Sequence, residues 1–315
     1  MTIYSDIDLS PNVQKFLPFI ADEFFFHKNY GLKHPSAIYN SSVGKIEASL
    51  KDFLDIYNKF TGVDFESVEK KYNTELTKNY KHFLYSLREH LDDCFHIIKC
   101  FTEPPLKEKS DRNQAAWLKK NHNETTKDFF EAIKSYKDYI DQVVNELKHN
   151  NGSIQGTAFY NEETPSEHCL GFFIANVIDG VYEPVEKIHP KMQDIYTAFS
   201  YRRDLTYNLY NVFLISEEIL NFIKSNTKVD FSLISPTLTK APDSKIELYK
   251  QVMGMPLVHF PDEYVKPVPS VSVTKQNTLK LDYPSQLTIR SNKLNRVVTN
   301  HIGDGHTATF RVPYM

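Results

Sequence analysis

The sequence predicts an α+β fold, in which an antiparallel helical bundle carries a β-hairpin insertion and a C-terminal antiparallel β region. Four long segments repeat apolar residues at steps of three and four, which places one apolar stripe along each predicted helix. The stretch between the third and fourth segments, and the tail after residue 226, instead alternate apolar and polar residues as strands do. Because the fourth helix must return to the bundle after the hairpin, we expect one compact unit rather than two free domains.

These patterns divide the chain into three regions. Residues 1–41 form an N-terminal arm that prolines interrupt and that packs on the body. Residues 42–226 form the helical bundle, with the β-hairpin insertion at about 154–186. Residues 227–315 form a β-rich C-terminal region, which we expect to pack on the bundle.

Composition narrows the class of protein. The chain of 315 residues is long enough for a large core, and its 41% hydrophobic and 24% charged content is typical of globular proteins. Its net charge of −3 gives no global attraction to nucleic acid or anionic membranes. This net value does not exclude local basic patches on the surface. No stretch approaches the ~18 consecutive apolar residues of a membrane span, so we expect no membrane partner. Three cysteines, and an N-terminus without a signal-peptide pattern, predict a cytoplasmic location.

The segment 113–152 holds the longest uninterrupted helical pattern, and we expect the other helices to pack around it. It exceeds the usual length of a globular helix, so 121–123 is the expected place for a break. Cations complement the dipole at its end, and asparagine and glycine follow in positions that tolerate a left-handed cap. Its apolar stripe consists of Phe129, Ile133, Tyr136, Ile140, Val143, Val144 and Leu147.

The other elements follow from caps, stops and turns. The first helix is expected to begin at Ser41 or Ser42, which can cap it, and prolines stop the second helix near Phe101. The dipeptide Asp179-Gly180 is typical of a tight hairpin turn. In chain order, we expect helices at about 42–60, 68–101, 113–149, 197–224 and 244–253, and strands at 154–160, 169–177 and 181–185, with several short strands after 270.

A polar strip lies at the end of the segment 113–152. At ~100° per residue, Asp141, Asn145 and Lys148 line up beside the apolar stripe, with His149 further round the helix. One interpretation is a polar functional site at this helix end. The other is a solvated flank with a cationic cap.

Arg202 is the most informative single charge in the sequence. It falls ~20° from Leu209 on a helical wheel, inside the apolar stripe of the fourth helix, whereas Arg203 and Asp204 are predicted to point away. An unpaired buried charge is costly, so a buried guanidinium needs a partner. We therefore expect either an anion-binding or catalytic arginine, or a structural arginine that snorkels or bonds to backbone carbonyls. The available helical carboxylates are Glu89, Asp92 and Asp141.

Two groups of residues that contain histidine raise the question of a metal site. Glu89, Asp93 and His96 share one face of the second helix, as in carboxylate-bridged bundles, but that face lies well away from the apolar stripe. A solvated charged face is the alternative. His301 and His306 flank a Gly-Asp-Gly turn. Two histidines alone are an incomplete set of zinc ligands. With ten glycines and no phosphate-binding loop, we expect no cofactor.

The helical part, about 42–150 with 197–224, resembles the HEPN superfamily of small helical bundles. Many members are ribonucleases or RNA-binding parts of toxin–antitoxin and phage-defence systems. The resemblance rests on the helix count and on the polar helix end Asn145-x-x-Lys148-His149. It implies an RNA partner and a site in which Asn145, Lys148, His149 and Arg202 converge.

The family's catalytic signature is an arginine and a histidine separated by four to six residues on a helix, which act on an RNA phosphate while a 2′-hydroxyl attacks. Arg88 and His96 have seven residues between them. Arg296 and His301 have the required four, but the valines between them indicate a strand. The signature is therefore not found on a predicted helix.

Three functional hypotheses follow. The first is a cytoplasmic binding or interaction protein without assignable catalytic activity, whose partner is another protein or a second copy of the chain. The second is a HEPN-like ribonuclease or RNA-binding effector of a toxin or phage-defence type. The third is a metal-binding helical-bundle enzyme that uses the second helix.

Overall fold

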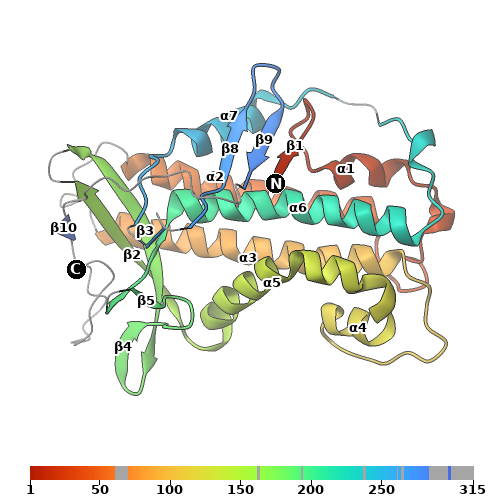
Figure 1. Ribbon diagram of the computed structural model, residues 1–315, viewed down its shortest axis with the longest axis horizontal. Coiled ribbons are helices and arrows are strands. Elements are labelled where there is room, and N and C mark those ends of the chain that lie inside the picture. The colour runs from red at the N-terminus through yellow and green to blue at the C-terminus, as the bar shows by residue number, and fades with distance from the viewer. Residues whose placement is uncertain are drawn as a thin grey trace.

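The computed structural model describes residues 1–60, 70–161, 164–192, 194–236, 239–260, 262–263, 266–283 and 297–298. The fold is α+β, as predicted. Long helices lie side by side, one antiparallel sheet closes one end of them, and a smaller sheet lies along their side (Figure 1). The long helices are α2 (Pro35–Tyr57), α3 (Lys70–Cys100), α5 (Asn123–His149) and α6 (Tyr201–Asn226), and the shorter ones are α1 (Asn12–Phe16), α4 (Gln114–Asn121) and α7 (Asp243–Gly254).

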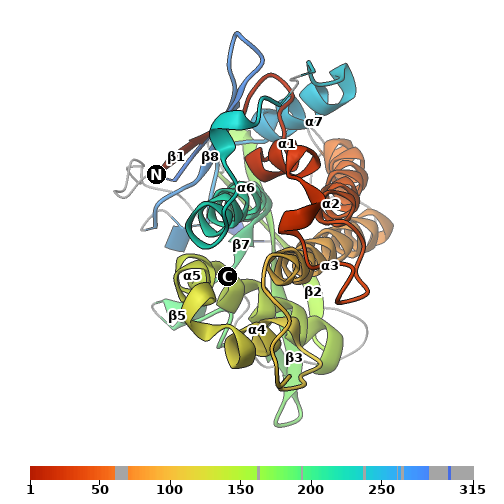
Figure 2. The same cartoon turned by 90° about the vertical axis from the view of Figure 1, so that its right-hand side faces the viewer.

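Helix α6 lies at the centre of the fold. It contacts α1, α3 and α5, the end sheet and the side sheet, and Figure 2 shows it enclosed among these elements. It buries residues on all sides, as a core helix does. The expectation that 113–152 is the organising segment is therefore wrong: it forms α4 and α5, with the predicted break at His122, on one flank. A clean amphipathic stripe is typical of a flanking helix, because only one of its faces is buried.

Helix α2 begins earlier than its sequence suggested. Pro35 occupies the first turn, where its fixed φ suits a helix and its missing N–H is not needed. The His34 Nδ1 atom accepts the Ser36 N–H at 3.2 Å and caps the helix. Ser42, one of the two predicted caps, is buried within the helix, with its Oγ 2.8 Å from Nδ1 of His90. The N-terminal arm is shorter than 1–41 for this reason.

The end sheet contains the predicted hairpin. Strands β2 (Ser153–Asn161), β3 (Thr164–Ile178) and β4 (Val181–Pro184) pair antiparallel in chain order. Asp179 and Gly180 have φ angles of 51° and 82°, as a two-residue hairpin turn between β3 and β4 requires. Two short strands extend the sheet: β7 (Phe199–Ser200) pairs with β3, and β10 (Val297–Val298) pairs with β2.

Strand β3 is buried on both faces over residues 169–175, whereas Val177 near its end is exposed. One face contributes to the main core, and the opposite face packs against Phe260 in a second core. Gly171 lies on this second face. A Cβ atom at position 171 would come within 2.3 Å of the Phe260 ring and of the Phe199 carbonyl oxygen, so only glycine admits this crossing. The main-core side chains are Leu170, Phe172 and Ile174, and the second-core side chains are Cys169, Phe173 and Ala175.

The side sheet joins the two halves of the sequence. Strand β1 (Thr2–Tyr4) pairs with β9 (Leu279–Asp282), which pairs with β8 (Ser270–Val273). The sequence predicted the C-terminal strands but not their pairing with the first residues of the chain. A further two-stranded ribbon consists of β5 (Lys191–Met192) and β6 (Ile195–Tyr196).

Several predicted features lie outside the described residues. These are the spaced pair Arg296 and His301, the turn before His306, and the strands expected near 287–289 and 308–312. Among the described helices, none is long and apolar enough to cross a membrane.

Candidate functional site

Two adjacent arginines lie in the first turn of α6. Ser200 caps this turn, because its Oγ accepts the Arg203 N–H at 3.4 Å. The start of a helix carries unpaired N–H groups and the positive end of the dipole. Arg202 and Arg203 therefore add two cations to a position that already favours anions.

Arg203 has acidic neighbours. Its guanidinium donates a hydrogen bond from Nη2 to the Pro267 carbonyl oxygen at 3.0 Å. Its positive charge acts to lower the pKa of Asp204, Asp262 and Glu263, against the larger effect of burial, which raises each of them. The charge of Arg203 is thus balanced by carboxyl groups within electrostatic reach.

Arg202 has no such balance. The residue is 7% exposed, so the prediction that it lies within the apolar stripe is confirmed. Its Nη1 atom is buried without a hydrogen-bond partner, and no carboxylate of the described chain forms an ion pair with it. Burial lowers the pKa of Arg202 to about 10, opposed only by the neighbouring Tyr57 hydroxyl. Among the described residues, the Arg202 guanidinium is therefore buried without an ion pair.

The carboxylates proposed as partners of Arg202 are engaged elsewhere. Asp92 and Asp141 both form ion pairs with Arg88, at 2.5 Å each. Glu89 lies 3.3 Å from the Lys45 ammonium. The expected pairing was wrong because helices α2, α3 and α5 already hold a cation close to each of these acids.

Glu263 is a second buried charge at the same helix start. It is fully buried, its Oε1 accepts the Ser200 N–H at 3.0 Å, and its Oε2 accepts the Phe260 N–H at 3.0 Å. Burial raises the pKa of Glu263 to about 7, against the lowering effects of Arg203 and of the Ser200 hydrogen bond. No local sequence pattern marks Glu263, since it lies in an irregular, proline-rich stretch that meets α6 only in the folded chain.

Ser200 and His259 form a polar pair beside the arginines. The Ser200 Oγ lies 3.2 Å from the His259 Nδ1, and both residues are fully buried. Burial and the two arginines lower the pKa of His259 to about 4, so its ring is neutral at pH 7 and can accept the serine hydroxyl proton. A serine beside a neutral histidine is the composition of a nucleophile and its base. Here the serine oxygen also caps α6, which favours a structural role.

Asp204 occupies a separate polar cluster in the core. It is 3% exposed, which overturns the prediction that it points away. Its carboxylate accepts hydrogen bonds from the Tyr80 hydroxyl at 2.5 Å, from the Tyr139 hydroxyl, and from the Asn208 side chain at 3.0 Å. The two tyrosines come from α3 and α5, whereas Asn208 lies on α6 itself.

The predicted helix-end residues lie on α5 rather than at the start of α6. Asn145, Lys148 and His149 are exposed at the end of α5, where the Lys148 ammonium lies 4.6 Å from the centre of the Tyr85 ring. In the part of the chain that the structure describes, no hydrogen bond or ion pair joins any of them to Arg202. The structure thus does not bring the four predicted residues into one contact network.

The candidate metal ligands Glu89, Asp93 and His96 do not form a metal-binding cluster either. Glu89 pairs with Lys45, while Asp93 lies 3.9 Å from Nδ1 of His96. Among the described residues, no group of three or more histidine, cysteine, aspartate or glutamate side chains could hold a metal ion.

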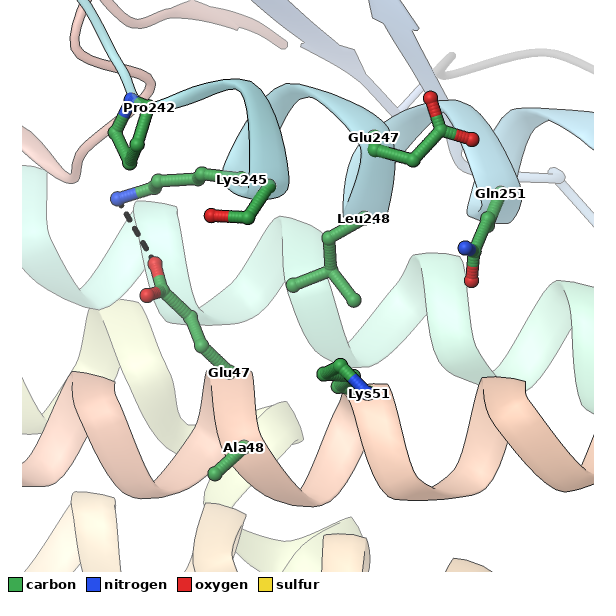
Figure 3. Close-up of a pocket in the computed structure, with 9 residues that line it drawn as sticks. Glu47, Ala48, Lys51, Pro242, Lys245, Glu247, Leu248 and Gln251 are labelled. Carbon is green, nitrogen blue, oxygen red and sulfur yellow. Dashed lines mark ion pairs between the residues drawn. The ribbon is translucent and has the colours of Figure 1, made fainter.

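A hollow of about 440 Å³ lies between α2 and α7. Figure 3 shows Lys245 reaching from α7 toward Glu47 on α2, where the two form an ion pair at 2.8 Å. Leu248 and Ala48 contribute apolar surface. The Glu47–Lys245 charges are paired with each other, in contrast to the charge of Arg202.

Comparisons with known proteins assign no family. No protein-family model matches the chain, no curated protein is similar to it, and no solved structure matches its fold. The functional argument therefore rests on the geometry of the α6 start.

Proposed function

We propose that this chain is a ligand-binding protein and that Arg202 holds an anionic group of its ligand. The observation that carries the proposal is the buried guanidinium of Arg202, which forms no ion pair within the described part of the chain. Burying an unpaired ion costs several kcal/mol (~3–5 when a buried pair is broken), and an anionic ligand offsets this cost by supplying the missing partner. The planar guanidinium suits carboxylate and phosphate groups, which it can bind through two parallel hydrogen bonds.

The surroundings of Arg202 favour an anion. The positive end of the α6 dipole and the Arg203 guanidinium lie beside it. Burial raises the pKa of Tyr57 far above neutrality, so its hydroxyl stays protonated and able to donate. His259 is neutral and adds no charge of either sign.

Inorganic sulfate is the simplest probe of this site. We expect sulfate to raise the melting temperature of the wild type and to leave that of Arg202→Met unchanged. Arg112→Met removes an exposed arginine and serves as the matched control, which should respond as the wild type does. Without ligand, Arg202→Met should be more stable than the wild type by ~1–4 kcal/mol, because it removes an unpaired buried charge. An equal sulfate response in Arg202→Met and the wild type would refute the proposal.

The ribonuclease hypothesis rests on the resemblance alone and has a separate test. It requires an arginine and a histidine at one phosphate, whereas His149 is exposed and Arg202 is buried. RNA cleavage by the wild type should be compared with an Asn145→Ala/His149→Ala double variant and an Arg296→Ala/His301→Ala double variant. Loss of cleavage in either double variant alone would assign the site, and an inactive wild type would count against the hypothesis.

A further inference from the structure

We propose that this site takes up its anion together with a proton, and that the Glu263 carboxyl group holds the proton. The inference rests on the proposed function, because it concerns the same anion at Arg202. The expected ligand is an anion that binds more tightly as the pH falls, rather than one whose affinity is the same from pH 6 to 8.5.

Glu263 lies at the same helix start that carries Arg202. Its Oε1 accepts the N–H of Ser200, two residues before Arg202, so the carboxylate is an internal anion at the start of α6. A second anion at Arg202 would put two negative charges in one buried region. Like charges in such a region disfavour each other, and protonation of one carboxyl group relieves the repulsion. The protonated group keeps its carbonyl oxygen as an acceptor for one of the two N–H groups of Ser200 and Phe260, and its hydroxyl oxygen retains a weaker acceptor capacity for the other.

Charged neighbours face Glu263 from α6 and from its own segment. On α6, Arg203 favours the ionised form of Glu263. On its own segment, Asp262 opposes ionisation, although the Lys266 ammonium lies 2.9 Å from Asp262 and reduces this effect. Arg202 lies in the same turn of α6 as Arg203.

The remaining titratable neighbours are uncharged at neutral pH. On β3, burial raises the pKa of the Cys169 thiol well above its usual range, with Glu263 adding to the effect. His259 stays neutral, since its pKa is lowered to about 4. The balance places the pKa of Glu263 at about 7 in the ligand-free protein, and a bound anion would raise it further. Glu263 is thus the group of this cluster whose charge changes near neutrality.

A quantitative expectation follows. At the effective dielectric constant of ~20 that suits protein sites, two charges in one buried region interact strongly enough to change an affinity on the order of tenfold. Sulfate keeps a constant charge from pH 6 to 9. We therefore expect its affinity for the wild type to fall on the order of tenfold as the pH rises from 6 to 8.5, with most of the change near pH 7.

Calorimetric titration with sulfate tests the coupling in two ways. The first is affinity against pH for the wild type, Glu263→Gln and the control Glu131→Gln, which removes an exposed carboxylate. We expect Glu263→Gln to bind with the same affinity at pH 6 and 8.5, and Glu131→Gln to follow the wild type. The second is proton uptake by the wild type near pH 7.5, measured in buffers of different ionisation enthalpy. We expect a clear fraction of one proton for each sulfate bound.

The outcomes separate this inference from the proposed function. Sulfate binding that depends on Arg202 but takes up no proton, or that keeps its pH dependence in Glu263→Gln, would overturn the coupling and leave the binding site standing. Sulfate binding that is absent at every pH, or unchanged in Arg202→Met, would overturn both. If Glu263→Gln does not fold, proton uptake by the wild type decides alone, and a value of zero rejects the coupling.

Discussion

Replacing the tyrosines around Asp204 should reveal how this buried carboxylate is held. The carboxylate is 3% exposed and accepts the hydroxyl groups of Tyr80 and Tyr139. A hydrogen bond to a charged group contributes ~1.5–3 kcal/mol, and its loss leaves the carboxylate less compensated. We expect Tyr80→Phe and Tyr139→Phe each to lower the free energy of unfolding by ~1.5–3 kcal/mol at pH 8.

The loss should depend on pH in a defined direction. Burial already raises the pKa of Asp204, and removing a donor raises it further. The folded variants then bind a proton that the unfolded chain, with a carboxyl pKa of ~3.9, has already released. Stability therefore falls as the pH rises from ~4 through the folded pKa of Asp204, so each variant should lose more relative to the wild type at pH 8 than at pH 5.

Urea unfolding followed by circular dichroism at pH 5 and pH 8 measures both effects. Tyr210→Phe is the control, because Tyr210 lies on α6 but its hydroxyl does not bond to Asp204. Because the Tyr210 hydroxyl forms no hydrogen bond within the described part of the chain, a change within ~0.5 kcal/mol is expected there. The reasoning is refuted if Tyr80→Phe and Tyr139→Phe lose no more than this control. It is also refuted if their losses are the same at both pH values.

Three further outcomes are expected. Gly171→Ala places a Cβ atom 2.3 Å from the Phe260 ring, so it should lower the free energy of unfolding by ~1–3 kcal/mol or more in a urea titration, and an unchanged midpoint would contradict the close packing. Arg88→Met leaves Asp141 without its guanidinium and should cost ~1–3 kcal/mol, a loss that 0.5 M salt added to both proteins should change little because the pair is largely buried. Burial raises the pKa of all three cysteine thiols, so none should react with a thiol reagent at pH 8 until urea unfolds the chain.

Local sequence signals predicted much of the secondary structure. The apolar stripe of α5 and its break at His122 follow from periodicity and from length, and Asp179-Gly180 marks the turn of the hairpin. Periodicity does not predict the start of α2 at Pro35, because a proline usually interrupts a pattern, whereas in the first turn of a helix it is favourable. These signals work because caps, turns and stripes depend on residues a few positions apart.

The centre of the fold did not follow from the same signals. A single apolar stripe is clearest on a helix with one buried face, so periodicity favoured the flanking α5 over the buried α6. The helical wheel also predicts that Asp204 faces solvent, because it shows only the direction of a residue on its own helix. It does not show the hydrogen-bond donors that other helices bring to a carboxylate. Its burial depends on hydroxyl donors that lie 124 and 65 residues away along the chain.

The sequence by itself determined that Arg202 lies in an apolar stripe, because helical spacing fixes the face of a residue. Only the tertiary structure decided what surrounds that charge. Asp92 and Asp141, which could have paired with Arg202, form ion pairs with Arg88. The Glu263 carboxylate accepts a hydrogen bond from Ser200, which lies 63 residues earlier in the chain. The physical reason is that a helix wheel reports direction, whereas the balance of buried charge depends on which side chains other elements bring within a few ångströms.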